Sequence, residues 1–408
     1  MDFDDSPEEL AFRAECVNWL SANASIRPDG AAEVWKSYRP RSEDEDRAGF
    51  AAAKRWQATK AAAGYAGMTW PERFGGRGLP HRLDGIFRAE ESRYDVPANA
   101  FQVGVDMVGP TLIAHGSEVH QRQHLDHIRR GERVWCQLFS EPGAGSDLAG
   151  LSTRGEVDGE EMLVNGQKVW TSGAHSSDWA ILLVRTNPDA RKHKGITYVL
   201  VDMRTPGIEV RPLRQIDGAV HFNEVFLTDV RIPLSNVVGD LNEGWQVTMT
   251  TLTAERTAIG GGGMVQMNEV RMLARHMGVD QDPVIRQGLA RMASLYEITR
   301  YLGFRVQTAA SQGRTPGPES SIMKLHISRL YAEAGDLYQQ MMGAAGMLWH
   351  DDAPYGGFFQ GVFLAQWAPR IGGGTDQIQR NVVGERVLGL PGEIRSDKDV
   401  PFRDLARR

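Results

Sequence analysis

The strongest constraint on the fold is a change in the pattern of apolar residues partway along the chain. From residue 134 to about residue 238, short apolar segments rich in β-branched residues alternate with turn dipeptides, which is typical of strands in a compact β domain. On either side, apolar residues recur at intervals of three and four, which is typical of amphipathic helices. Helices, then strands, then helices predict an α+β fold and argue against a Rossmann sheet, which needs alternating strands and helices.

The chain has 408 residues, which is long for a single hydrophobic core. We therefore expect three domains: a helical domain over residues 1–130, a β domain over residues 131–240 and a helical bundle over residues 241–408. A capping box at Ser6-Pro7-Glu8-Glu9 predicts where the first helix begins, since Ser6 and Glu9 can each bind the backbone N–H of the other.

Periodicity and turn residues predict the remaining elements. Further helices are expected at 47–63, 82–93, 119–129, 244–277, 283–312, 319–343 and 377–388, with breaks at 278–283 and 313–318. In the helix 319–343, Leu330, Ala334, Leu337 and Met341 share one face and predict packing against partner helices. Strands are expected at 134–139, 180–185, 196–202, 208–212 and 225–232, and Asp158-Gly159 and Asn165-Gly166 predict hairpin turns.

Composition excludes several classes of protein. The net charge of −6 provides no basic field for nucleic acid. Cys16 and Cys136 are the only cysteines, which argues against a disulfide framework and fits a reducing compartment. The acidic amino terminus does not look like a targeting sequence, and the most apolar stretch, 179–184, is too short to span a bilayer. We therefore expect a cytoplasmic protein without membrane insertion, and the histidines show no metal-ligand pattern.

Two sequence runs in the β region are candidates for ligand binding. In Glu141-Pro142-Gly143-Ala144-Gly145-Ser146-Asp147, the glycines let backbone N–H groups approach a flat or anionic ligand, although an exposed turn would have the same composition. In Asn165-Gly166-Gln167-Lys168-Val169-Trp170-Thr171-Ser172-Gly173, a strand ends in an aromatic plate followed by hydroxyls. This arrangement suits stacking beside a planar ring, although Trp170 could equally be a core aromatic.

Together the two runs resemble the acyl-CoA dehydrogenase family, and the similarity extends over almost the whole chain. The resemblance implies a helical domain, a central β-barrel and a C-terminal four-helix bundle, with FAD between barrel and bundle. It places Gln137, Phe139, Ser140, Trp170, Thr171 and Ser172 around the flavin ring, and Ser146 at the pantetheine or phosphate part of coenzyme A.

A third run concerns the catalytic base. Many family members have Glu-Gly-Thr within the segment that here is Ile371-Gly372-Gly373-Gly374-Thr375, and Gly373 stands where their catalytic Glu would be. The pattern resembles the branch with isovaleryl and long-chain types, whose base lies on the first bundle helix. Here that residue is Glu255, although a Glu-Arg pair on a helix is also typical of a solvated face. The neighbouring Arg256 points about 100° away along the helix and is assigned to the substrate.

Other family positions imply cofactor contacts across a subunit boundary. Thr375 and Gln377, with Gln340, Gly343 and Ala344, match positions that bind the adenosine part of FAD. The Arg-x-x-Phe diphosphate clamp of the family is not recognisable, and Arg275 or Arg286 is the candidate to replace it. These matches imply a homodimer or homotetramer, with a hetero-oligomer as the alternative.

The resemblance implies a reaction as well. A base removes the α proton of an acyl-CoA thioester, the β hydrogen leaves as hydride to flavin N5, and a trans-2-enoyl-CoA remains. The backbone N–H of Gly373 would bond the thioester oxygen as charge develops there. An electron-transfer flavoprotein or similar acceptor would reoxidise the flavin. The alternatives are a non-catalytic flavoprotein subunit, an acyl-CoA oxidase and a flavin monooxygenase, and the acyl group stays open among branched, long-chain and sterol-derived thioesters.

Overall fold

A computed structural model describes residues 5–27, 43–259, 265–311, 319–392 and 399–405. The chain packs into two compact units. The first contains Met1–Ser42, His81–Val96 and Ile259–Gly392, and the second contains Glu43–Pro80, Pro97–Ala258 and Glu393–Arg408. Each unit is thus assembled from segments far apart in sequence, and the three domain boundaries expected from the sequence stay a prediction.

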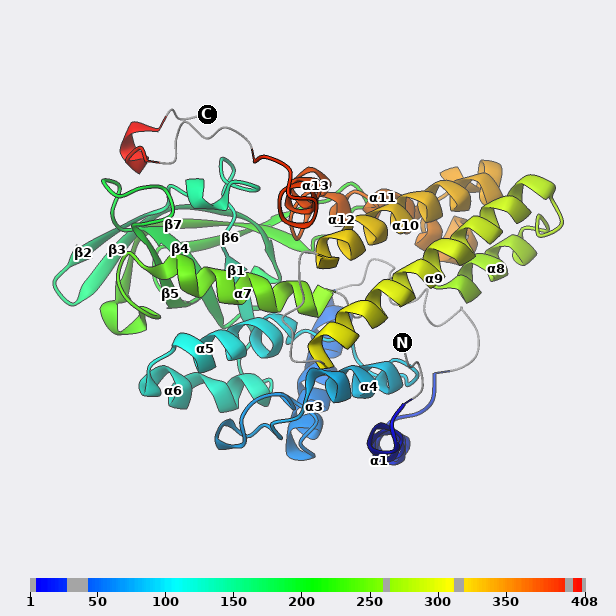
Figure 1. Ribbon diagram of the computed structural model, residues 1–408, viewed down its shortest axis with the longest axis horizontal. Helices are drawn as coiled ribbons and strands as arrows, with labels where there is room; N and C mark the ends of the chain where they lie inside the picture. The colour runs from blue at the N-terminus through cyan, green and yellow to red at the C-terminus, as the bar shows by residue number, and fades with distance from the viewer. Residues whose placement is uncertain (1–4, 28–42, 260–264, 312–318, 393–398, 406–408) are drawn as a thin grey trace. The chain divides into compact units, whose positions relative to one another are not determined.

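The second unit is built on a curled sheet, which is seven-stranded over the described residues. Its strands are β1 Trp135–Leu138, β2 Arg154–Asp158, β3 Glu161–Ser172, β4 Trp179–Arg185, β5 Ile196–Asp202, β6 Ile208–Leu213 and β7 Phe222–Pro233 (Figure 1). The path runs β1-β4-β2-β3-β7-β6, and β5 pairs with the other edge of β4. β1 runs parallel to β4, whereas the β2–β3, β3–β7, β4–β5 and β6–β7 pairs are antiparallel. The expected strands are confirmed, and together with the helical segments they confirm the α+β fold.

Both faces of the central strands are buried because successive side chains point to opposite sides of a strand. In β4, Ile181 and Leu183 join a core shared with helices, whereas Ala180, Leu182 and Val184 pack on the other face of the sheet. The helical elements of this unit are α3 Glu43–Ala62, a π-helix at Val103–Val108, α5 Gly109–His115, α6 Glu118–Arg129 and α7 Gly244–Ile259. Figure 1 shows α5, α6 and α7 along one side of the sheet.

One of the two expected hairpin turns is wrong. Asp158-Gly159 does join β2 to β3, with Gly159 at φ +64°. Asn165-Gly166 lies inside β3, where the pairing with β7 shifts register between Val164 and Gly166. Gly166 has no side chain for a different reason: a Cβ there would lie 2.5 Å from Thr153 Oγ1 and 2.8 Å from Thr153 Cα. The glycine permits a close approach between strands and a β-bulge instead of a turn.

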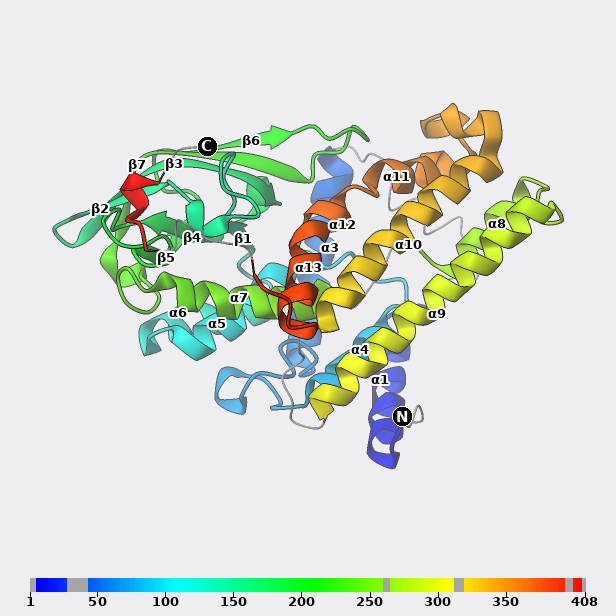
Figure 2. The ribbon, with the colours of Figure 1, turned by 45° about the horizontal axis from the view of Figure 1, so that its top comes forward.

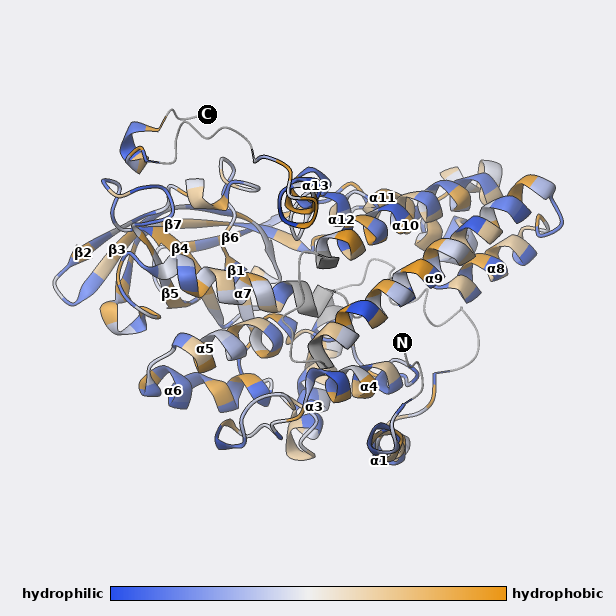
Figure 3. Ribbon diagram, in the orientation of Figure 1, coloured by the Kyte–Doolittle hydropathy of each residue, from blue (hydrophilic) through white to orange (hydrophobic). Residues whose placement is uncertain are grey.

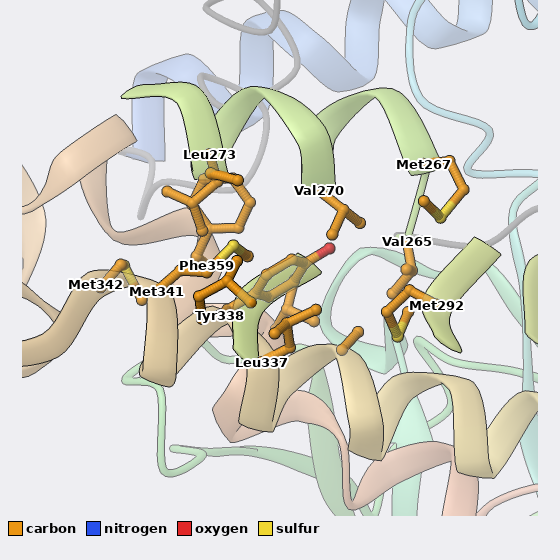
Figure 4. Packing of buried hydrophobic residues seen from close by; sticks show 14 of the residues in the cluster. Val265, Met267, Val270, Leu273, Met292, Leu337, Tyr338, Met341, Met342 and Phe359 are labelled. Atoms are coloured by element: carbon orange, nitrogen blue, oxygen red, sulfur yellow. The ribbon is translucent and has the colours of Figure 1, made fainter. Parts of the chain in front are cut away.

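The first unit is helical. Its α-helices over the described residues are α1 Pro7–Asn23, α4 His81–Glu91, α8 Met267–His276, α9 Pro283–Ser311, α10 Glu319–Met342, α11 Phe358–Ala365, α12 Ala368–Ile371 and α13 Asp376–Val382 (Figure 2). The capping box at Ser6 and Glu9 is confirmed at the start of α1. The predicted face of α10 is also confirmed, because Leu330, Ala334, Leu337 and Met341 belong to the core of this unit, part of which Figure 4 shows.

Two expected helices end elsewhere than predicted. The helix expected over 244–277 is two helices, because α7 ends at Ile259 and α8 begins at Met267. The glycines at 260–263 and the break at 313–318 lie outside the described residues. The helix expected over 377–388 becomes a π-helix at Val383–Val387 after α13. Over the residues that the structure describes, no helix is long and apolar enough to cross a membrane.

Candidate functional site

A buried ion pair fixes the loop that carries the first motif. The Glu141 carboxylate accepts hydrogen bonds from Ser152 N at 2.7 Å, Ser152 Oγ at 2.9 Å and Thr153 N at 2.9 Å. It also accepts from Lys168 Nζ at 2.8 Å, and the same ammonium donates to the carbonyl of Phe139 at 3.1 Å. The side chain of Lys168 is 0% exposed. Lys168 on β3 therefore connects the end of β1 to the start of β2.

Charge pairing decides the protonation of Glu141. Burial by itself would raise the pKa of this carboxyl, but the charge of Lys168 and the surrounding hydrogen bonds hold the pKa below its usual value. Opposite charge and donated hydrogen bonds favour the ionised form. The Glu141 carboxyl at the start of this loop is thus ionised at neutral pH.

The two motifs that the sequence places about 25 residues apart meet at this point. The N–H of Val169 donates to the carbonyl of Ser140 at 2.9 Å. Gln137 and Ser140 are half-buried, whereas the Phe139 side chain is buried and packs edge-on against Tyr198 with ring centroids 6.0 Å apart. Phe139 can therefore offer a ligand its main chain and not its ring.

The end of β3 presents an aromatic ring to the surface. Trp170 is 61% exposed and has φ +61°, a backbone conformation that is rare outside glycine, at a register shift between Lys168 and Thr171. Ser172 is exposed as well, whereas the Thr171 hydroxyl is buried and has no hydrogen-bond partner among the described residues. Strain of this kind concentrates at functional sites.

These groups suit a planar, hydrogen-bonding ring. Trp170 supplies an exposed ring that packs edge-on against Phe222, with ring centroids 5.9 Å apart. Ser172 supplies an exposed hydroxyl two residues later, Ser140 a half-buried hydroxyl on the segment bonded to Val169, and Thr171 a buried hydroxyl without a partner among the described residues. The isoalloxazine of FAD needs this combination of stacking and edge hydrogen bonds. The residues present therefore fit the flavin that the sequence resemblance implies.

The helix that carries Glu255 is anchored by a buried hydroxyl network. Thr251, one turn before Glu255 on α7, shares hydrogen bonds with Thr111 on α5 at 2.9 Å and with the Tyr198 hydroxyl on β5 at 3.2 Å. His115 Nε2 shares a further bond with Thr250 at 2.8 Å. Residues four apart lie on the same helix face, so the network fixes the rotation of α7 that sets the direction of the half-buried Glu255. The Arg256 side chain lies outside what the structure describes.

The glycine run of the third motif precedes α13 in the helical unit. Gly373 and Gly374 have φ +62° and +85°, and Thr375 caps α13 by accepting from Ile378 N at 3.2 Å. The Gly373 carbonyl accepts from Gln379 Nε2 at 2.9 Å. Sequence reasoning missed Gln379, a buried glutamine that holds the Gly373 carbonyl. A glutamine six residues after a glycine gives no pattern by which to find it.

The other predicted cofactor contacts are exposed in the same unit. Gln340 lies in the last turn of α10, Gly343 and Ala344 follow that helix, and Gln377 lies on α13. Arg275 at the end of α8 and Arg286 at the start of α9 are exposed too. Their assignment to FAD, like the pairing of Gly373 with Glu255, stays a prediction.

Family models for acyl-CoA dehydrogenases match three consecutive parts of the chain. The N-terminal domain matches residues 27–132, the middle domain residues 136–230 and the C-terminal domain residues 242–388. Acyl-CoA dehydrogenase IpdE1 of Mycobacterium tuberculosis is 37% identical over 398 residues, which cover 94% of this chain and 98% of that protein.

Two solved structures are similar over nearly the whole chain. A structure described as the Tcur3481-Tcur3483 steroid ACAD has a TM-score of 0.81 at 28% identity, covering 96% of this chain and 100% of that chain. The ChsE4-ChsE5 complex from Mycobacterium tuberculosis has a TM-score of 0.77 at 26% identity, covering 96% and 100%. With the family models and the full-length relative, these likenesses confirm the resemblance found in the sequence. The chain belongs to the acyl-CoA dehydrogenase family of flavoprotein oxidoreductases.

Proposed function

We propose that the chain catalyses FAD-dependent α,β-dehydrogenation of an acyl-CoA thioester to the trans-2-enoyl-CoA, with Glu255 as the base. The observation that carries this proposal is the hydroxyl network of Thr251, Thr111 and Tyr198, which fixes α7 one turn before Glu255. In support, residue 373 is a glycine at φ +62°, so a catalytic carboxylate is missing from the position where many family members have one.

Several residues of this chain would each have a separate role in the reaction. A carboxylate with an ordinary pKa of about 4.3 is a weak base for an α C–H, so Glu255 needs a site from which bound substrate excludes water. The Gly373 N–H would bond the thioester oxygen, and the carbonyl of the same residue is already held by Gln379. Trp170, Ser140 and Ser172 would hold the flavin. FAD, when bound, supplies the acceptor for the hydrogen and electron pair lost from the β carbon.

The substrate would reach this site through its coenzyme A part. Ser146 is exposed on the loop between β1 and β2, and the buried Glu141–Lys168 pair holds the base of that loop. The related structure described as a steroid ACAD favours a steroid-derived acyl-CoA over branched or long-chain thioesters. A panel of the three thioester classes therefore starts with the steroid-derived one.

The test replaces the proposed base. Glu255→Gln keeps the side-chain shape and removes the base, so we expect a loss of at least about 100-fold in kcat, the scale of general acid–base catalysis. Reduction of an electron-acceptor dye by acyl-CoA measures turnover, and the flavin absorbance of the purified protein measures cofactor content. Glu255→Asp, which keeps a carboxylate, is the matched control and should retain more activity than Glu255→Gln.

Substantial turnover by Glu255→Gln with full flavin content would reject Glu255 as the base. Consumption of O₂ during turnover without added acceptor would point to an oxidase or monooxygenase, whereas dependence on an electron-transfer flavoprotein or dye supports a dehydrogenase.

A second candidate function is that of a flavoprotein subunit that completes a partner's active site. Gly373 and the missing Arg-x-x-Phe clamp favour it, and both similar structures are described with a pair of names. The chain purified alone decides between the two. Bound flavin that bleaches on addition of acyl-CoA supports the catalytic role, whereas colourless protein supports the partner role.

A further inference from the structure

Residues 399–405 pack against the strand ends of the sheet unit. Phe402 N donates to the carbonyl of Ala190 and Arg403 N to the carbonyl of Pro188, both at 2.9 Å. Ion pairs join Asp399 to Arg191 at 2.9 Å and Arg403 to Asp189. The segment therefore has backbone and side-chain contacts to one stretch, residues 188–191. Figure 2 shows its short helical turn, Phe402–Asp404, beside the strands.

The contact reaches a buried arginine. The guanidinium of Arg185, at the end of β4, lies 3.9 Å from the centroid of the Phe402 ring. Nη1 of Arg185 donates to the carbonyls of Lys192 and Lys194, both at 2.9 Å, and Nη2 donates to the carbonyl of Ala149 at 2.6 Å. Arg185 is 3% exposed, and Phe402 covers the face of its guanidinium.

Arg185 in turn holds the loop that carries Ser146. Ala149 lies three residues after Ser146, and the Asp147 carboxylate pairs with Lys192 Nζ at 2.5 Å. The Gly150 N–H donates to the carbonyl of Asp147 at 2.9 Å. A continuous set of contacts thus runs from Phe402 through Arg185 to the loop at residues 146–151.

We propose that Phe402 is a positioning residue that fixes this loop for the coenzyme A part of the substrate. The inference rests on the proposed function, because it assumes that Ser146 meets coenzyme A. A cation over an aromatic face is held more strongly when both are desolvated, so the ring keeps Arg185 on the Ala149 carbonyl. A loop that is already ordered loses less conformational entropy when the substrate binds. Loss of the Phe402 ring should therefore raise KM.

The experiment compares two thioesters of the same acyl group. Phe402→Ala should raise KM for the acyl-CoA about three- to tenfold and leave kcat within about twofold. The acyl-N-acetylcysteamine thioester lacks the nucleotide and most of the pantetheine, so its KM should not change. Phe402→Tyr, which keeps the ring, should restore the wild-type KM.

Phe226→Ala is the matched control. Phe226 is also a half-buried phenylalanine under an arginine, with the Arg211 guanidinium 4.3 Å from its ring centroid, but Arg211 otherwise bonds Glu209. Phe226→Ala should leave both KM values unchanged. The proposal is overturned if Phe402→Ala leaves KM for the acyl-CoA unchanged or raises KM for both thioesters equally.

Hydrogen exchange tests the positioning without any substrate. Peptides that cover residues 147–153 should exchange faster in Phe402→Ala than in wild type, and not in Phe226→Ala. Arg403→Glu, which places like charges opposite Asp189, should act in the same direction. If wild type turns over neither thioester, the proposed function fails, and the exchange experiment still decides the role of Phe402: unchanged exchange overturns it.

Discussion

Glu141 and Lys168 show what a single buried pair does in this protein. Neither residue is a predicted ligand contact, yet Lys168 joins the loop after β1 to β3, the strand that carries Trp170. Removing one partner of a buried pair leaves an uncompensated charge, which costs far more than losing an exposed pair. The pair therefore sets the geometry of both motifs and the stability of the unit.

We expect Lys168→Met to lower the free energy of unfolding by about 3–5 kcal/mol. The exposed pair of Lys194 and Glu243 provides the control, because Lys194→Met should cost under about 1 kcal/mol. Urea titration of both variants measures the difference. The double variant Lys168→Met with Glu141→Gln should be more stable than Lys168→Met alone, since the Glu141 charge is then no longer buried without the ammonium of Lys168.

The same pair gives stability a dependence on pH. The folded-state pKa of Glu141 is lowered, so its contribution is present above the unfolded pKa of about 4.3 and is lost as pH falls through the folded pKa. Melting temperatures between about pH 6 and pH 3 should therefore fall more steeply for wild type than for Glu141→Gln. If melting temperature falls equally with pH in wild type and in Glu141→Gln, protonation of Glu141 is not the cause of the pH dependence.

At the scale of elements, one helix start, one turn and one helix face are those predicted from neighbouring residues, whereas the prediction fails where two strands approach each other closely. The capping box, the turn at Asp158-Gly159 and the apolar face of α10 need only neighbouring residues, and all are confirmed. Asn165-Gly166 has the composition of a turn but lies in β3, because backbone pairing with β7 continues on both sides of it, from Val164–Val230 to Gly166–Leu227. Thr153 packs where a Cβ of residue 166 would be, which explains the glycine. Figure 3 shows that the strands of this sheet include many hydrophobic residues.

Gly166→Val should therefore destabilise the sheet unit by about 1–3 kcal/mol, because the atoms it meets include the Thr153 backbone. Gly143→Ala is the control: no atom lies within 4 Å of a Cβ there, so its effect should stay within about 0.5 kcal/mol. Thermal unfolding followed by circular dichroism compares the two. Equal melting temperatures for both variants would contradict the close-approach explanation.

At the scale of the whole molecule, apolar side chains are exposed on the last elements of the helical unit. They are Trp367, Ile371, Ile378, Val387, Leu388 and Leu390, from the end of α11 to the segment after α13. Large exposed apolar side chains are common in protein–protein interfaces. We infer that these six residues take part in the assembly of subunits.

Leu388 tests that inference, because it is 65% exposed. We expect the wild-type chain to form a dimer or tetramer and Leu388→Asp to shift it toward the monomer, measured by light scattering after size exclusion. Ile216→Asp is the control, since Ile216 is 78% exposed in the other unit and should leave the mass unchanged. A monomeric wild type, or a Leu388→Asp variant of unchanged mass, would refute the assignment.

Much of the candidate site was predictable because its motifs are local. The runs around Ser140 and Trp170 identified the family, and the structure brings them together through the bond between Val169 and Ser140. The motif predicted that Phe139 lies at the site but not that its ring points inward, because that direction depends on packing against Tyr198 from another strand. Gln379 could not be foreseen, because its bond to Gly373 depends on how α13 begins.

The sequence by itself determined the order of helical and β segments, the start of the helix that Ser6 caps and the membership of the family. These follow from backbone preferences and side-chain spacing over a few residues. Only the tertiary structure decided that Gly166 sits in a strand, that Lys168 carries the loop after β1, and that Phe402 lies on Arg185. Each of these joins segments separated in the chain, and such contacts are selected by packing volume and buried charge, which no local pattern encodes.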